Sequence, residues 1–105
     1  MNLQCGEGDD SEIALHFNPR WDDDAGSVFV LNSLDDGAWG EEIRGPNFIG
    51  PGMEVQIYIL CKDDGFCVML DGSNSVACFP HRLDTGRVTH VAVDGCIKVS
   101  RIMAI

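Results

Sequence analysis

Short apolar stretches separated by turn signals run along the whole chain. In residues 13–17 and 55–61 a large apolar side chain or a cysteine recurs at every second position, as a half-buried β-strand requires. Four Asp-Gly pairs and one Gly-Pro-Gly break stand between such stretches, at residues 36–37, 64–65, 71–72, 94–95 and 50–52. The stretches are too short for helices, so the pattern predicts antiparallel β-structure.

We expect about nine strands, which is enough for a two-sheet β-sandwich. They cover residues 2–5, 13–20, 27–33, 39–44, 55–61, 66–70, 76–79, 87–93 and 96–104. In the second of these the alternation directs one set of side chains into the core and another outward: Ile13, Leu15 and Phe17 inward, and Ala14, His16 and Asn18 outward. Because no repeat or linker interrupts the 105 residues, a single all-β domain is predicted for residues 1–105.

The charge of the chain excludes some classes of partner. Seven Lys and Arg residues stand against seventeen Asp and Glu, which gives a formal net charge of −10. This charge repels phosphate backbones and anionic lipids, so nucleic acid and acidic membranes are poor partners. No apolar run reaches the roughly 18 residues of a membrane span, and residues 1–10 do not resemble a signal peptide. We therefore expect no membrane insertion and a cytoplasmic protein.

The five cysteines are odd in number and lie apart within apolar stretches, at Cys5, Cys61, Cys67, Cys78 and Cys96. They form no CxxC pair and no Cys/His cluster with zinc spacing, so they do not indicate a zinc site, and no cofactor is expected. Unpaired cysteine behaves as a small hydrophobe, and free buried thiols are therefore the expectation.

One strand face carries three polar side chains. A period of two places His16, Asn18 and Arg20 on the same face, while Pro19 marks an edge, a bulge or a strand end because it cannot donate to the ladder. The following strand ends near Asn32, and antiparallel pairing can bring Asn32 onto that face. Taken alone, His16 would more often be a structural histidine than a ligand; together with its polar neighbours, a binding role is favoured.

A tryptophan and two oppositely charged residues follow in the next segment. Trp39 comes just after an Asp-Gly turn and before a charged strand, which favours exposure over a core position. Alternation in that strand sets Glu42 beside Arg44. Mixed donors and acceptors suit sugar hydroxyls, and a flat Trp ring suits the apolar C–H face of a sugar. A galactoside fits, because its axial hydroxyl lies beside such a C–H face.

The chain resembles the carbohydrate-recognition domain of a galectin in three segments of matching order and spacing. They are Leu15-His16-Phe17-Asn18-Pro19-Arg20, Val30-Leu31-Asn32-Ser33 and Trp39-Gly40-Glu41-Glu42-Ile43-Arg44. The resemblance runs from about Asn2 to the C-terminus and includes Cys78-Phe79-Pro80-His81-Arg82 and a closing strand over residues 99–105. It implies a jelly-roll β-sandwich lectin that needs no metal. Its partners would be β-galactosides of the lactose or N-acetyllactosamine type on glycans and glycoproteins.

The resemblance also implies a role for each matching residue. His16, Asn18 and Arg20 would bind the axial and neighbouring hydroxyls of galactose, and Asn32 its exocyclic hydroxyl. Trp39 would stack on the ring. Glu42 and Arg44 would reach galactose and the adjoining sugar, with Glu42 also paired to Arg20. Galectins are made in the cytosol and leave it without a signal peptide, so an extracellular role stays open.

The sequence departs from the galectin pattern in two places. Galectin domains carry further strands before the one expected at residues 2–5, so the fold is expected to be shortened at its N-terminus. This would leave strand edges exposed and keeps open a homo-oligomer, or a protein that acts mainly through protein contacts. The loop Asp22-Asp23-Asp24 is acidic and should disfavour sialylated or sulfated sugars.

Three further features have competing explanations. Trp21 either joins the site or packs under the loop, and we leave it out of the site. The run Asp22 to Asp24 lacks the spacing of an EF-hand, so a solvated turn is favoured over a calcium loop. Glu41 and Glu42 are adjacent and face opposite ways on a strand, which makes them a poor acid and base pair for glycoside hydrolysis. We therefore expect a binding protein and not an enzyme.

Overall fold

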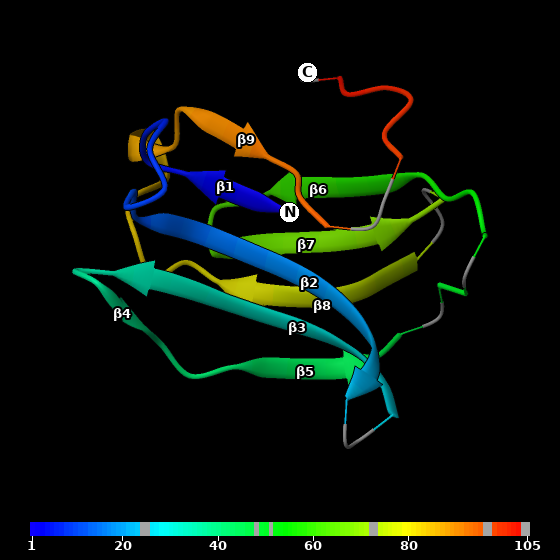
Figure 1. Cartoon of the computed structure of the whole chain (residues 1–105). Coiled ribbons are helices and arrows are strands. Elements are labelled where there is room, and N and C mark those ends of the chain that lie inside the picture. The colour runs from blue at the N-terminus through cyan, green and yellow to red at the C-terminus, as the bar shows by residue number, and fades with distance from the viewer. Residues whose placement is uncertain (24–25, 48, 51, 72–73, 96–97, 104–105) are drawn as a thin grey trace.

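The computed structural model, which describes residues 1–23, 26–47, 49–50, 52–71, 74–95 and 98–103, forms two antiparallel sheets (Figure 1). The first sheet contains β1 (Asn2–Gln4), β2 (Ile13–Asp23), β3 (Gly26–Asp35), β4 (Ala38–Trp39), β5 (Ile43–Pro46) and β9 (His90–Ala92). The second contains β6 (Ile57–Cys61), β7 (Gly65–Leu70) and β8 (Asn74–Pro80). A 3-10 turn over Thr85–Arg87 is the one helical element of the described residues, among which no helix is long and apolar enough to cross a membrane. The predicted all-β two-sheet sandwich is confirmed.

The first sheet is built around β2 and β3. Its strand order is β9, β1, β2, β3, and both β4 and β5 pair with the far side of β3. Asp36 and Gly37 have φ values of 51° and 77°, the left-handed conformation that a tight hairpin needs at both central residues. The predicted Asp-Gly turn therefore carries β3 into β4 and sets Trp39 opposite Leu34.

The prediction of one strand over residues 39–44 is wrong. The chain leaves the ladder after Trp39 and returns at Ile43, so residues 40–42 belong to no strand. The carbonyl groups of Gly40 and Glu41 accept hydrogen bonds from the side chains of Asn32 and Arg82 instead. Side chain to backbone bonds have replaced the strand ladder at this point.

The predicted strands near the C-terminus are also corrected. The strand expected over residues 87–93 is limited to His90–Ala92, and residues 98–103 form no strand. Val99, Ile102 and Met103 are exposed, and no strand of the described residues pairs with this segment. A strand pattern without a neighbour has no hydrogen-bonded partner to hold it extended. Residues 96, 97, 104 and 105 lie outside the described residues.

The cysteines differ from the expectation of free buried thiols. Cys67 and Cys78 stand directly opposite each other in β7 and β8, with a Cα–Cα distance of 4.1 Å, and form a disulfide. Cys61 is free but exposed, and Cys5 is free and half-buried. Cys96 lies outside the described residues. The apolar setting of each cysteine was visible in the sequence, but the register that pairs two of them was not.

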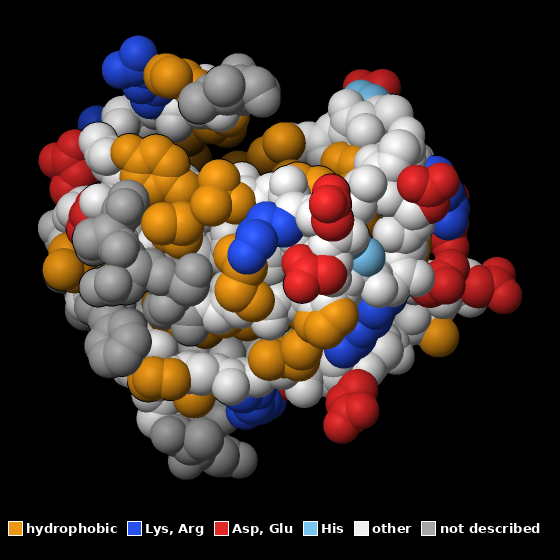
Figure 2. Space-filling model, turned by 180° about the vertical axis from the view of Figure 1, so that it is seen from behind, with side chains coloured by type: hydrophobic (Ala, Val, Ile, Leu, Met, Phe, Trp, Pro, Cys, Tyr) orange, Lys and Arg blue, Asp and Glu red, His pale blue; other side chains and the backbone are white. Residues whose placement is uncertain are grey.

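One edge of the second sheet leaves apolar side chains in contact with solvent. Strand β6 pairs only with β7 among the described strands, and Ile57, Tyr58 and Leu60 are all exposed. Figure 2 shows hydrophobic side chains in several groups between charged ones over the face seen from behind. Among the described strands, β6 is therefore an open edge of the second sheet.

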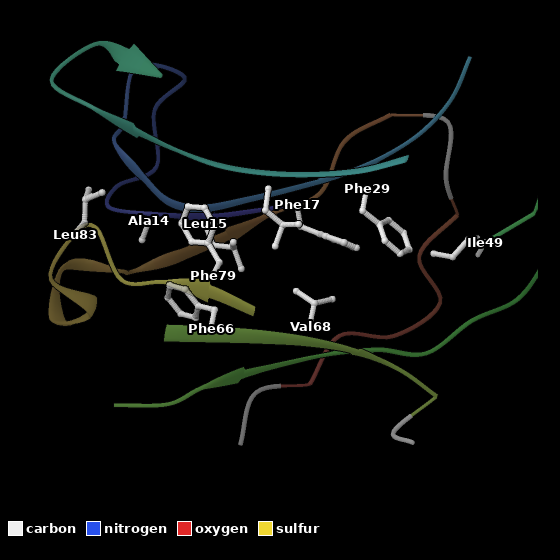
Figure 3. Packing of buried hydrophobic residues seen from close by; sticks show 10 residues of the cluster. Ala14, Leu15, Phe17, Phe29, Ile49, Phe66, Val68, Phe79 and Leu83 are labelled. Carbon is white, nitrogen blue, oxygen red and sulfur yellow. The ribbon is translucent and has the colours of Figure 1, made fainter. Parts of the chain in front are cut away.

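The core lies between the two sheets. Phe17 and Phe29 from the first sheet face Phe66, Val68 and Phe79 from the second (Figure 3), and all five are at most 3% exposed. Leu15 and Phe17 are buried as predicted. Ala14 is buried as well, contrary to the expected alternation, because the pairing of β2 with β3 shifts register between Ile13 and His16. From His16 onward the expected polar face is restored, and this face carries the site.

Candidate functional site

Strand register assembles the candidate site on the outer face of the first sheet. His16 pairs with Asn32, Asn18 pairs with Val30, and Val30 pairs in turn with Arg44. Three strands thus present polar side chains side by side, since directly opposed residues lie within about 5.5 Å of each other. The pairing brings Asn32 next to His16, as the sequence suggested.

A pocket of about 350 Å³ opens on this face, lined by His16, Arg20, Val30, Asn32, Trp39, Gly40 and Glu42. Five of the seven predicted site residues line it. The other two adjoin it through their partners: Asn18 Oδ1 accepts from Arg20 Nε at 2.7 Å, and Arg44 Nε donates to Glu42 Oε2 at 2.9 Å. The implied pairing of Glu42 with Arg20 stays a prediction, although both side chains line the same pocket.

Trp39 forms one wall of the pocket and remains open to solvent. Its side chain is 52% exposed, which excludes the core position that the sequence left as an alternative. The His16 ring lies beside it, with ring centroids 5.0 Å apart and an angle of 57° between the planes. An exposed indole ring next to polar groups gives the pocket one apolar and one hydrogen-bonding wall.

His16 is held in a defined orientation and in its neutral form. Its Nδ1 lies 2.6 Å from Oδ1 of Asn2 in β1; with this oxygen as acceptor, Nδ1 carries the proton and Nε2 is an acceptor. Burial lowers the pKa of His16 below its usual range, and the positive charges of the N-terminus and Arg20 lower it further, against a smaller opposite effect of Glu42. Asn2 was not expected at the site.

Asn32 is almost fully buried, at 5% exposure, and its amide is oriented by three hydrogen bonds. Oδ1 accepts from Ser33 N–H at 2.8 Å and from Arg82 Nη1 at 3.0 Å, and Nδ2 donates to Gly40 O at 2.9 Å. The two donors and the carbonyl acceptor allow only this amide orientation. Arg82 was not predicted at the site, although it stands in the galectin-like segment 78–82.

Two neighbouring features lie beside the pocket. Trp21 is partly exposed, does not line the pocket, and donates its indole N–H to the carbonyl of Ile49. Asp24 lies outside the described residues, and the side chains of Asp22 and Asp23 are not described either. The effect of this acidic loop on sugar preference therefore stays a prediction.

The sequence and fold match known proteins over nearly the whole chain. A family model described as galactoside-binding lectin matches residues 1–104. Human galectin-7 is 40% identical over 103 residues, which cover 97% of this chain and 73% of that protein. Human galectin-2 is 34% identical over 99 residues, which cover 93% of this chain and 71% of that protein.

Solved structures give the same fold. Sheep galectin-11 superimposes with a TM-score of 0.69 at 23% sequence identity, covering 83% of this chain and 62% of the galectin-11 chain. At this identity the likeness concerns the fold, while the family match rests on the sequence. The chain belongs to the galectin family of galactoside-binding lectins, which are binding proteins and not enzymes.

Proposed function

We propose that the pocket binds the galactose of lactose-type and N-acetyllactosamine-type glycans. The observation that carries the proposal is the pairing of a half-exposed Trp39 ring with polar groups in one pocket. The indole suits the C–H face of galactose, and the polar wall suits its axial hydroxyl and the hydroxyls beside it. A sugar with an equatorial hydroxyl at that position would not present the same two faces.

Each polar residue has a role in this binding mode. His16, Asn18 and Arg20 bind the axial hydroxyl and its neighbours, with His16 Nε2 accepting and the Arg20 guanidinium donating. Asn32 binds the exocyclic hydroxyl through its second Nδ2 hydrogen, which no group of the described residues takes up. Glu42 and Arg44, held together at 2.9 Å, extend the site towards the adjoining sugar.

Titration calorimetry with lactose and cellobiose tests the proposal. The two disaccharides differ in the configuration of one hydroxyl, so lactose is expected to bind and cellobiose is not. We expect Trp39→Ala and Arg20→Ala each to weaken lactose binding by at least about thirtyfold, because each removes a central contact. Trp21→Ala is the matched control, since Trp21 is also partly exposed but does not line the pocket.

Equal heats with the two disaccharides would contradict the choice of sugar. Unchanged lactose affinity in both Trp39→Ala and Arg20→Ala would contradict the choice of site. The acidic loop adds a finer expectation, that a sialylated lactose binds more weakly than lactose at low salt because Asp22 to Asp24 repel its carboxylate.

A second candidate function is contact with another protein chain, and the exposed edge strand β6 favours it. Ile57, Tyr58 and Leu60 are 37%, 43% and 48% exposed, beside backbone groups that no described strand pairs. Such an edge can pair with a second copy of the chain. Light scattering with and without lactose separates the candidates: an oligomer in a protein that does not bind lactose supports protein contact as the main function, and a lactose-binding monomer contradicts it.

A further inference from the structure

Arg82 reaches the pocket wall from the opposite sheet. It follows β8 of the second sheet by two residues, yet its guanidinium contacts the first sheet. Nη1 donates to Asn32 Oδ1 at 3.0 Å and to Ser33 Oγ at 3.3 Å, and Nη2 donates to the Glu41 carbonyl at 2.7 Å. The guanidinium carbon also lies 4.4 Å from the centre of the buried Phe79 ring. Arg82 is therefore fixed to the core on one side and to the back of the site on the other.

The contact with Asn32 decides which end of its amide faces the pocket. Since the Arg82 guanidinium and the Ser33 N–H group can only donate, they engage the amide oxygen and leave the amide nitrogen to donate to Gly40 O and to the ligand. Without Arg82, one of the three bonds that fix this orientation is lost, and the amide oxygen keeps only the Ser33 N–H as a donor. A rotated amide would present an acceptor where the proposed ligand contact needs a donor.

The contact with Glu41 holds the segment that replaces the strand ladder. Residues 40–42 lie between Trp39 and the Glu42–Arg44 pair, outside any strand, and Arg82 Nη2 binds their backbone. The fit is close at Gly40, where a Cβ atom would stand 2.5 Å from Arg82 Nη1 and 3.2 Å from Asn32 Oδ1. A side chain at residue 40 would therefore have to displace the Arg82 guanidinium from its present position.

We propose that Arg82 is a positioning residue of the galactoside site, which sets the donor end of Asn32 towards the ligand and fixes the path of residues 40–42. Arg82 does not line the pocket and so acts through these partners and not on the sugar itself. The inference rests on the proposed function, because it assigns the effect to the residue proposed to bind the exocyclic hydroxyl. It predicts a loss of affinity that depends on that hydroxyl.

The test compares Arg82→Met with the wild type on two ligands, methyl β-galactoside and its 6-deoxy analogue. Met keeps the apolar contact with Phe79 but cannot donate. We expect affinity for the galactoside to fall roughly tenfold and affinity for the analogue, which has no exocyclic hydroxyl, to fall by less than about threefold. Arg82→Lys should be intermediate, since one ammonium cannot bridge Asn32 and Glu41 as a guanidinium does. Arg101→Met, in the exposed segment 98–103, is the control and should leave both affinities unchanged.

Equal losses for the two ligands would overturn the proposal, because general destabilisation does not distinguish them. Unchanged affinity for the galactoside would also overturn it.

A second measurement needs no ligand and separates this inference from the proposed function. In ¹H–¹⁵N spectra of the free protein, the Asn32 side-chain amide signals should move towards solvent-exposed values in Arg82→Met and Arg82→Lys and stay in place in Arg101→Met. Unmoved Asn32 signals would refute the positioning role even if wild-type protein binds lactose. Wild-type protein that binds no galactoside would refute the proposed function, while these spectra still decide the role of Arg82.

Discussion

Strands β3 and β6 are both rich in apolar residues, but their surroundings differ. In β3 six consecutive residues, Val28 to Ser33, are buried, because β2 and β5 flank the strand and the second sheet covers one face. In β6, Ile57, Tyr58 and Leu60 are exposed, and β7 is the one described neighbour. The difference shows that the number of neighbouring strands, more than apolar content, decides how deeply a strand is buried.

The candidate site lies on the sheet that contains the buried strand β3. Each main polar residue of the site is tied to a partner: His16 to Asn2, Asn32 to Arg82, and Arg20 to Asn18. A weakly binding ligand gains from this arrangement, because the protein loses little conformational freedom when the sugar arrives. The edge at β6 has no such requirement, and its exposed side chains can vary without reaching the pocket.

The largest expected effect is a loss of stability when a buried side chain of β3 is truncated. Phe29→Ala should lower the free energy of unfolding by about 3–5 kcal/mol, because Phe29 is fully buried at the centre of the core. Leu60→Ala, the matched change in β6, should lower it by less than about 1 kcal/mol. Urea unfolding followed by fluorescence measures both. Equal losses in the two variants would contradict the comparison between the strands.

The sequence was sufficient for the parts of the fold that local patterns encode. The alternation around Leu15 and Phe17 and the Asp36-Gly37 turn predicted the strands and hairpin that carry His16 and Trp39. Neighbours within one strand, and strands joined by a short turn, leave little freedom in register. For this reason the sequence indicates that antiparallel pairing can bring Asn32 onto the face that carries His16.

What the sequence could not give are contacts between distant segments. The Cys67–Cys78 pair depends on the register of β7 with β8, which no local pattern fixes. Arg82 reaches Asn32 over a separation of 50 residues, and Asn2 reaches His16 from another strand. The segment 98–103 was predicted to be part of a strand but has no neighbouring strand among the described residues, and the sequence of the segment alone does not show this.

The second prediction concerns the disulfide of the second sheet. Cys67 and Cys78 are 11 residues apart, and opening so short a loop should lower the free energy of unfolding by about 3 kcal/mol. The double variant Cys67→Ala with Cys78→Ala should show this loss in urea unfolding and keep its lactose affinity, since both cysteines lie outside the pocket. Cys61→Ala, an exposed free thiol in the same sheet, is the control. Lost lactose affinity in the folded double variant would contradict the comparison, because it would mean that a change in the second sheet alters the pocket on the first sheet.

The smallest expected effect concerns the protonation of one site residue, His16. Because burial and nearby positive charges lower the pKa of His16, the imidazole is neutral at pH 7, and proposed ligand binding uses its unprotonated Nε2. Lactose affinity should be constant above about pH 6.5, the usual histidine pKa, and fall about tenfold per pH unit once the pH drops below the lowered pKa of His16. Stability should decline in the same direction, from about pH 6.5 down through that pKa, because the unfolded chain takes up the proton first.

Titrations of lactose between pH 5 and pH 8 measure the effect, with His90→Gln as the control in exposed strand β9. His90→Gln should keep the wild-type pH profile, whereas His16→Gln should bind weakly with a flat profile. Lactose affinity that stays constant while an NMR titration shows His16 taking up its proton would mean that the proton does not oppose the ligand, and that the site is not set by the neutral imidazole. A profile changed by His90→Gln would instead place the sensitive group at the edge of the first sheet, away from the pocket.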